Sequence, residues 1–258
     1  MISGIFHTGS GLGNQLHRYI ATRVLALDHG YDWQMFYPEN FKGSFMNLEL
    51  PEAKPYNGEP KHFVEKKVVV DGVDIRSYDP EFNFIEDGTL IDGEFQDERY
   101  FKHRMAEVAK WLVVKPLNVP DDVCVIGFRG GEYALFPELF LTKDYWDEAI
   151  EIMRQKNPDI KFEVHTDDPV TARQFFPDFK IVENEQLSHS LHSNMGLNWR
   201  AVRYAKYAII ANSSFYILPR LLRHWESEAL TLAPRYWARR NTGVWATPSN
   251  YYSDFSYV

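Results

Sequence analysis

The feature that most constrains this chain is a short apolar run that ends in an arginine and two glycines. Val123–Phe128 is rich in β-branched residues, which is typical of a strand buried on both faces. Arg129-Gly-Gly follows directly. Open α/β sheets bind ligands beyond the carboxyl ends of their strands, and a guanidinium forks onto phosphate oxygens. The stretch therefore indicates an anion-binding arginine, although a turn in which Arg129 pairs with Glu132 fits equally well.

Composition sets the broad class of protein. The 258 residues are 45% hydrophobic, enough for one large domain or two small ones. The net charge of -8, with scattered basic residues, argues against a nucleic-acid partner. Cys124 lies inside the apolar run and is expected to be a buried, inert thiol, as in a reducing compartment. With no targeting segment and no apolar run of about 20 residues, we expect a cytoplasmic protein without an integral membrane segment.

The amino-terminal region has the layout of a phosphate-binding turn. A strand is expected over residues 2–6 and a helix from Leu16 to Asp28, with a glycine-rich loop between them. Gly9 and Gly11 fit the dinucleotide fingerprint, but Asn14 stands at its third glycine position. The loop suits an anion without belonging to either common nucleotide-binding class, and a plain strand-to-helix connection remains open.

A second polar cluster follows a strand expected to end near Ile91. Residues 31–90 contain five prolines, which break up long elements, and residues 66–70 are a credible strand within them. Glu94 and Gln96 lie in the expected exit loop, before a helix predicted over residues 99–114. Both side chains would then point near the glycine loop, with ordinary surface polarity as the alternative.

The second half repeats the strand-helix pattern after a proline-bearing join at residues 116–121. Helices are expected over residues 143–155, 171–176 and 193–207, and strands over 160–164 and 180–182. Asp167 and Asp168 follow a strand, where the pair could accept hydrogen bonds from a nucleotide base. The alternative is that Asp167 caps the next helix.

A further strand from Tyr207 ends in Asn212, Ser213 and Ser214, ahead of a helix through Arg223. Its start is either a second anion site or an ordinary N-cap. Residues 230–237 would close the sheet, and the tail from Asn241 would be packed. Recurrent strand-helix order predicts parallel sheets. The expected domains are residues 1–118 and 119–240, followed by the tail 241–258.

Several motifs, in order, resemble those of the α-1,2-fucosyltransferases, and together they span residues 5–237. Gln15-Leu-His17 and Thr166-Asp-Asp-Pro169 are also similar to the related α-1,6-fucosyltransferases. The α-1,2 motifs are Gly11-Leu-Gly-Asn-Gln15, Gly93-Glu-Phe-Gln96 with Tyr100-Phe101, Phe128-Arg-Gly-Gly-Glu-Tyr133, Thr166-Asp-Asp168, Ala211-Asn-Ser-Ser-Phe215, and Ala233-Pro234 with Trp237.

The resemblance implies a GT-B architecture, with two Rossmann-like domains around a cleft. It implies inverting transfer of fucose from GDP-fucose to a hydroxyl of a glycan or glycoside acceptor, with no metal and no further cofactor. Arg129 would pair with the β-phosphate, and Asp167 or Asp168 would contact guanine. Ser213 or Ser214 would bond phosphate, and residues 11–14 would line the reaction centre. The remaining donor-site candidates are Gly11, Gly13, Asn14, Gln15, His17, Gly127, Asn212 and Phe215.

The chain departs from the family pattern at four positions. Gly127 replaces the family histidine, Gly130 the second arginine, Glu132 the aspartate and Glu94 the tyrosine. Two alternatives therefore stay open: a donor such as GDP-mannose, GDP-rhamnose or a UDP- or dTDP-sugar, and a module that binds a glycan or nucleotide without turnover.

Glycosyl transfer builds negative charge on the departing diphosphate, which Arg129 would stabilise in the absence of a metal. The general base is less constrained than the arginine. Glu94 is the first candidate and Glu132 the second.

Overall fold

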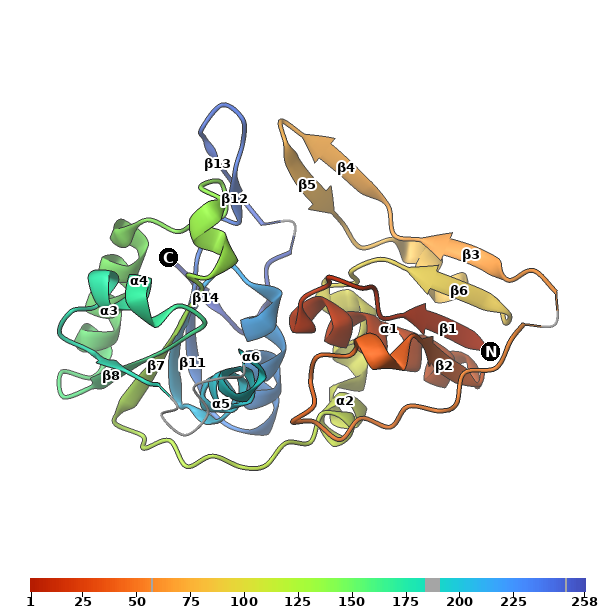
Figure 1. The fold of residues 1–258 in the computed structure, drawn as a ribbon, viewed down its shortest axis with the longest axis horizontal. Coiled ribbons are helices and arrows are strands. Elements are labelled where there is room, and N and C mark those ends of the chain that lie inside the picture. The colour runs from red at the N-terminus through yellow and green to blue at the C-terminus, as the bar shows by residue number, and fades with distance from the viewer. Residues whose placement is uncertain (57, 184–190, 249) are drawn as a thin grey trace. The chain divides into compact units, whose positions relative to one another are not determined.

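The computed structural model describes residues 1–56, 58–183, 191–248 and 250–258 (Figure 1). The chain forms two compact units. Unit 1 comprises Met1–Val69, Asp74–Val114 and Ser249–Tyr252, and unit 2 comprises Val70–Val73, Lys115–Pro248 and Ser253–Val258. The main division between them thus falls at Val114–Lys115.

Unit 1 is built on a four-stranded parallel sheet in the order β2-β1-β6-β3. Its strands are β1 (Ile2–Ile5), β2 (Trp33–Phe36), β3 (Lys61–Val64) and β6 (Thr89–Asp92). A separate two-stranded sheet consists of β4 (Lys67–Val70) and β5 (Val73–Arg76). The helices are α1 (Leu12–His29) and α2 (Met105–Trp111), with 3-10 turns η1 (Pro38–Asn40), η2 (Pro80–Phe84), η3 (Glu98–Tyr100) and η4 (Lys102–Arg104).

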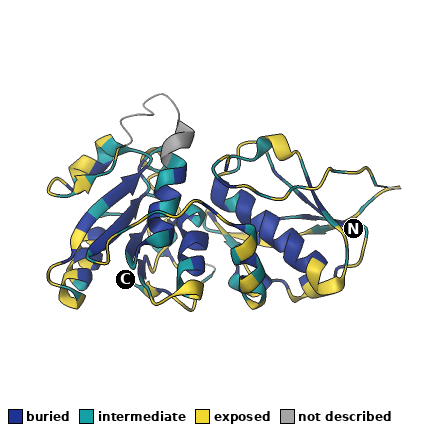
Figure 2. Cartoon of the chain, turned by 90° about the horizontal axis from the view of Figure 1, so that it is seen from below, coloured by how far each residue is buried: buried dark blue, intermediate teal, exposed yellow. Residues whose placement is uncertain are grey.

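Helix α1 supplies most of the first unit's core. Nearly all of its residues from Leu12 to Ala26 are buried, whereas its last turn is exposed (Figure 2). It ends at Gly30, whose φ of 68° provides the left-handed cap that glycine favours. Thus α1 begins directly after the glycine loop and holds that loop against the sheet.

Unit 2 is built on a six-stranded sheet in the order β14-β11-β10-β7-β8-β9, in which the neighbouring strands are parallel. Its strands are β7 (Val123–Phe128), β8 (Lys161–Thr166), β9 (Lys180–Ile181), β10 (Tyr207–Ile210), β11 (Leu230–Ala233) and β14 (Ser256–Tyr257). The helices are η5 (Glu132–Leu135), α3 (Lys143–Lys156), α4 (Pro169–Phe175), α5 (Leu191–Tyr204) and α6 (Ser214–Glu226), and β12 (Ala238–Arg239) pairs antiparallel with β13 (Trp245–Ala246).

These sheets confirm the expected α/β class with two Rossmann-like units. All six residues of β7 are buried, as the sequence predicts for a strand covered on both faces. Cys124 within it is fully buried, and burial raises the pKa of its thiol well above the usual range. The thiol is therefore inert, as expected.

The structure corrects two expected elements. Strand β11 does not close the sheet, because β14 from the chain's end pairs beyond it through Leu232 and Ala233. The tail is packed, as expected, since Phe255 and Val258 are buried. The helix expected over residues 99–114 is only α2, because Phe101, with φ -146° and ψ -14°, separates two 3-10 turns ahead of it.

Candidate functional site

In unit 2, three loops meet at the carboxyl edge of the sheet. The parallel register sets Phe128 of β7 beside Thr166 of β8, and Gly127 beside Ile210 of β10. Arg129, Asp167 and the loop before α6 each follow one of these neighbouring strands. The sequence predicted these clusters separately, and the sheet order brings them to one edge, where α/β sheets bind ligands.

Arg129 is the centre of this edge. Its guanidinium donates one hydrogen bond to Asp167 and, at 2.9 Å, another to Glu132, and it lies 5.4 Å from the ring centroid of Tyr133. The side chains of Arg129 and Asp167 are each 26% exposed, whereas that of Glu132 is 62% exposed. Among the described residues, no acceptor bonds the buried Nε of Arg129. The turn pairing with Glu132 is therefore real, but it leaves donor capacity on the guanidinium.

Burial and pairing act in opposite directions on this ion pair. Burial acts to lower the pKa of Arg129, but Asp167, two tyrosines (Tyr216 and Tyr133) and Glu132 together outweigh it and raise the pKa. Burial raises the pKa of Asp167 more than Arg129 and the Gly130 amide lower it. The guanidinium thus stays charged, and the Asp167 carboxylate depends on it for compensation.

Two glycines let the loop that carries Asp167 and Asp168 approach the arginine loop closely. The Gly130 amide donates to Asp167 at 3.0 Å. A Cβ at Gly131 would lie 2.3 Å from an Asp167 carboxylate oxygen, and one at Gly130 would lie 2.7 Å from Cβ of Asp168. Gly130, where the resembled family has its second arginine, is therefore a close-approach position in this chain.

Gly127 is also a packing glycine, and its expected place at the donor site stays a prediction. A Cβ there would lie 2.9 Å from two ring carbons of Tyr216. The Tyr216 hydroxyl donates to the Phe128 carbonyl at 3.0 Å, and the ring is buried. Tyr216 thus fills the space that a histidine at position 127 would need.

The two aspartates divide their roles in the reverse of the expected way. Asp168, not Asp167, caps α4 by accepting from the Thr171 amide at 3.1 Å. Its own amide is held by the Thr166 hydroxyl at 2.9 Å. Asp167 is therefore free of the helix and available to the arginine loop.

The loop before α6 holds Asn212 in the protein interior. Asn212 is 2% exposed and its amide donates to the carbonyls of Leu139 and Trp237. Its expected place at the donor site stays a prediction. Ser213 is the N-cap residue, but its side chain makes no capping bond to the helix. Ser214 and Phe215 follow, both partly exposed. The dipole of the helix start favours an anion.

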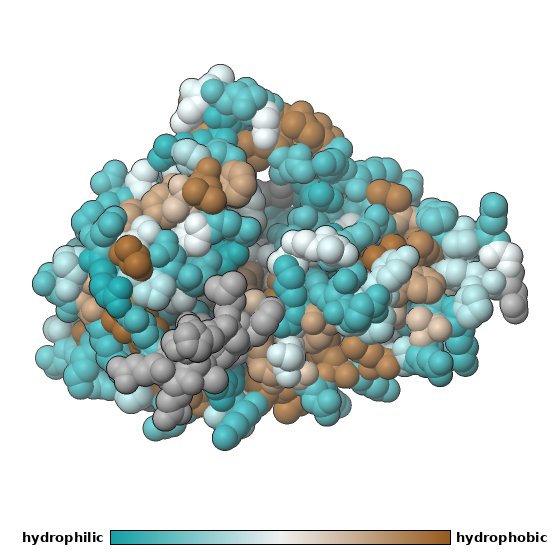
Figure 3. Space-filling model, in the orientation of Figure 1, coloured by the Kyte–Doolittle hydropathy of each residue, from teal (hydrophilic) through white to brown (hydrophobic). Residues whose placement is uncertain are grey.

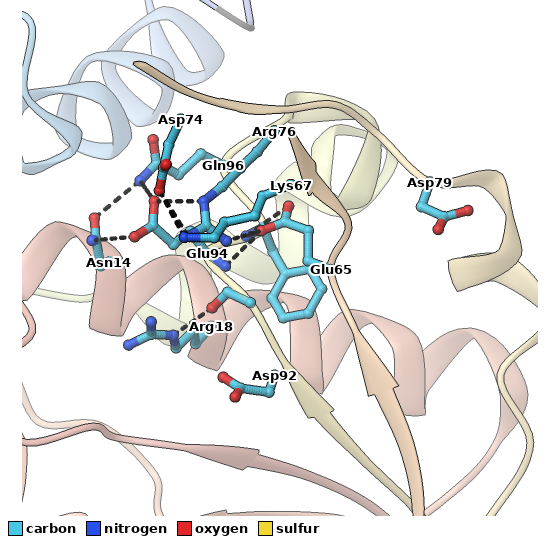
Figure 4. A network of polar contacts seen from close by, with 12 residues as sticks. Asn14, Arg18, Glu65, Lys67, Asp74, Arg76, Asp79, Asp92, Glu94 and Gln96 are labelled. Atoms are coloured by element: carbon cyan, nitrogen blue, oxygen red, sulfur yellow. Dashed lines mark hydrogen bonds and ion pairs between the residues drawn. The ribbon is translucent and has the colours of Figure 1, made fainter. Parts of the chain in front are cut away.

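In unit 1, the glycine loop and the Glu94 loop also meet. Asn14 donates to the Glu94 carboxylate at 3.2 Å, and Gln96 donates to both Asn14 and Glu94, at 3.0 and 3.1 Å (Figure 4). The Glu94 side chain is 28% exposed and lies 3.6 Å from the Arg76 guanidinium. This confirms that Glu94 and Gln96 point towards the glycine loop.

Other residues of the glycine loop are structural. Gln15 is fully buried and bonds the Asn40 carbonyl and the Lys42 amide. His17 is fully buried, bonds the Gly13 carbonyl at 2.8 Å, and has its pKa lowered by burial to about 4. Both side chains thus have structural contacts in the interior of unit 1, and their expected place at the donor site stays a prediction. Gly13 is buried, while Gly11 is exposed with open space around it.

Three residues that the sequence did not single out build this network. Glu65 accepts from the backbone of Glu94, and Arg18 donates to the Gly93 carbonyl and the Ser10 hydroxyl. Arg76, from β5, lies between Glu65 and Glu94. Glu65 and Arg76 fall in the proline-rich stretch with no legible motif, so only the charge of Arg18 within an apolar helix pattern was a usable signal.

The described residues were compared with the side-chain groups that hold metals and with the helices that span membranes. Within these ranges, no group of three or more His, Cys, Asp or Glu side chains is arranged to hold a metal ion. No helix in the described part of the chain is both long and apolar enough to span a bilayer. On the face drawn in Figure 3, hydrophobic residues form separate groups within a mostly hydrophilic surface.

Comparison with known proteins gives a fold-level likeness. No protein-family model matches the chain, and no curated protein matches it either. Among solved structures, E. coli heptosyltransferase WaaC with ADP is similar over 100% of this chain and 92% of that chain, with 12% sequence identity and a TM-score of 0.47. A likeness of this size does not bear on substrate or activity, which must be argued from the site.

The packing of Gly127 against Tyr216 gives a stability prediction. Gly127→Ala should lower the free energy of unfolding by about 1–3 kcal/mol, because the added methyl overpacks a filled core. Chemical denaturation of both proteins measures this, with Gly11→Ala as the control, since a Cβ there meets nothing within 4 Å. Equal stability of Gly127→Ala and the wild type would contradict the packing role.

Proposed function

We propose that this protein is an inverting glycosyltransferase that moves a deoxyhexose, L-fucose from GDP-fucose, onto a sugar hydroxyl. The observation that carries the proposal is the convergence of Arg129, Asp167 and the start of α6 at one edge of the unit 2 sheet. A cation and a helix start together suit a diphosphate. The ordered fucosyltransferase-like motifs favour fucose as the transferred sugar.

Arg129 takes the diphosphate by exchanging one partner. Glu132 is the exposed partner and Asp167 the partly buried one, so the phosphate replaces Glu132 while Asp167 keeps the guanidinium in place. The exchange loses little, since an exposed ion pair contributes only about 0–1 kcal/mol. The buried Nε adds a further donor once the side chain adjusts.

The chemical step needs charge stabilisation at the leaving group. Negative charge grows on the diphosphate as the sugar becomes oxocarbenium-like, and a guanidinium held in advance stabilises that charge selectively. Losing one such donor typically costs roughly 3 kcal/mol. Arg129, fixed by Asp167 and by the ring of Tyr133, has this preorganisation.

Glu94 is the general base for the acceptor hydroxyl. Its carboxylate is oriented by Asn14 and Gln96 and stays partly exposed, as a group that must meet a substrate hydroxyl requires. Glu132, the other candidate, is engaged by Arg129 and is the group that the phosphate displaces. Glu94 therefore takes the base role and Glu132 that of a placeholder.

The base of the nucleotide is proposed on the resemblance. Both oxygens of Asp168 accept from Thr171, one from its amide and one from its hydroxyl, but a carboxylate offers about four lone-pair sites and can still accept from a guanine. Gly127 cannot supply the family histidine's contact, because Tyr216 occupies that space. GDP-mannose, GDP-rhamnose, and UDP- or dTDP-sugars are therefore the donors to test beside GDP-fucose.

Arg129→Ala should reduce kcat by at least 100-fold, about 2.7 kcal/mol, because the diphosphate loses its guanidinium. Transfer from GDP-fucose and the alternative donors is measured by product formation. Arg173→Ala is the matched control, since Arg173 also pairs with a carboxylate, Glu183, but on the exposed surface of the same unit. A loss of kcat below tenfold in Arg129→Ala would show that Arg129 has no part in the chemical step. Product formed from UDP-sugars alone would show that GDP-fucose is not the donor.

Glu94→Gln should lower kcat by about 10²–10⁴-fold, the range typical of a general base, with the donor KM nearly unchanged. The amide keeps the side chain's size and one of its two acceptor positions towards Asn14 and Gln96, but it cannot accept the proton. Glu132→Gln serves as the comparison and should keep most of the turnover. The reverse ranking of the two variants would transfer the base role to Glu132.

A further inference from the structure

The Glu94 loop carries an unfavourable backbone conformation at its next residue. Phe95 has φ 47°, in the left-handed region that non-glycine residues seldom adopt. Such a conformation is strained and persists only where the surroundings impose it. Something must therefore hold the backbone at Phe95, directly beside the proposed base.

Glu65 is the group that holds it. Its carboxylate accepts from the Glu94 amide at 2.7 Å and from the Phe95 amide at 3.2 Å to each oxygen. The residue is 4% exposed. Burial raises the pKa of Glu65, while the two amides and Arg76 act to lower it. A buried carboxylate that accepts from two successive backbone amides stabilises the loop conformation in which both N–H groups face it.

The position of Glu65 is itself fixed by the sheet. It directly follows β3, and its amide bonds the Asp92 carbonyl at 2.8 Å, which extends the β3–β6 pairing by one step. A Cβ at Gly93 would lie 2.5 Å from Cβ of Glu65, so the glycine lets the two chains meet. The carboxylate thus rests on the rigid part of unit 1.

Phe95 anchors the other side of the loop. Its fully buried ring packs against Phe82 and Tyr100, with both ring centroids at 5.4 Å, and lies 6.5 Å from Phe63. The backbone between Glu65 and these rings has little freedom. The Glu94 side chain therefore leaves the loop in one direction, towards Asn14 and Gln96 (Figure 4).

We propose that Glu65 is a positioning residue that presents the Glu94 carboxylate to the acceptor hydroxyl. It acts through the backbone of residues 94 and 95, and with Arg76, which lies 3.5 Å from Glu65 and 3.6 Å from Glu94. The inference rests on the proposed function, in which Glu94 is the base. It assigns a role to a buried carboxylate that itself touches no substrate.

Glu65→Gln is the direct test. An amide has no negative charge and only one acceptor oxygen, so the Phe95 amide exchanges one of its two acceptors for an NH₂ group that repels it, and the loop relaxes. We expect kcat to fall at least tenfold with the donor KM within about twofold, because the donor site lies in unit 2. Glu59→Gln, at an exposed glutamate of the same unit, should leave both values unchanged. Glu65→Asp retains two acceptor oxygens, so its kcat should lie between those of Glu65→Gln and the wild type. If Glu65→Gln does not fold, Glu65→Asp is measured in its place.

Coupling to Glu94 separates positioning from general destabilisation. In a Glu94→Gln background, the Glu65 substitution should change kcat by less than about twofold, because residues that act as a unit are not additive. A second full tenfold loss in that background would overturn the inference.

A crystal structure of Glu65→Gln gives a readout that does not depend on activity. We expect Phe95 to leave the positive φ region and the Glu94 carboxylate to move away from Asn14. An unchanged loop would overturn the positioning role even if transfer is observed. A moved loop in a protein whose wild type forms no glycoside product would instead overturn the proposed function.

Discussion

The parallel pairing of β7 with β8 is the constraint on which the proposed donor site depends. Six residue pairs, from Val123 with Lys161 to Phe128 with Thr166, fix where both strands end. Arg129 and Asp167 are the first residues after their strands that can meet, and they form an ion pair. Because β10 borders β7 on its other side, the start of α6 reaches the same edge. The fold thereby assembles a guanidinium and a helix start from segments more than 80 residues apart.

The local positive charge of Arg129 explains how an acidic protein could bind an anion. With a net charge of -8, the chain does not attract anions by its overall field. Arg129 instead carries a local positive charge that two carboxylates hold in place without using all of its donors. In the proposed function, a diphosphate, which has more charge and more acceptor oxygens than a carboxylate, replaces the exposed Glu132.

Much of the fold could be predicted because its signals are local. The buried strand at Val123–Phe128 and helix α1 follow from residue pattern, and the positions of Arg129 and Glu94 after strands follow from the same reasoning. Strand β14 could not be predicted, since two residues near the chain's end carry no periodicity. The prediction of one helix over residues 99–114 was wrong, because the spacing of apolar residues does not reveal the backbone geometry at Phe101.

Side-chain roles were harder to predict than strands, because they depend on tertiary neighbours. Nothing in the sequence places Tyr216 over Gly127 or shows that Asp168, rather than Asp167, caps α4. Glu65 could not be identified from the sequence for the same reason, because its hydrogen-bond donors are two backbone amides some 30 positions away. Conversely, Gln15 and His17 matched a motif, yet the core of unit 1 uses them for packing.

A structure of the protein crystallised with GDP tests most directly whether a nucleoside diphosphate binds to Arg129. We predict β-phosphate oxygens within hydrogen-bonding distance of the Arg129 guanidinium and the first amides of α6, with Glu132 displaced and Asp167 still paired. GDP bound elsewhere, or an Arg129 that keeps both carboxylates while the phosphates sit apart from it, would contradict the account.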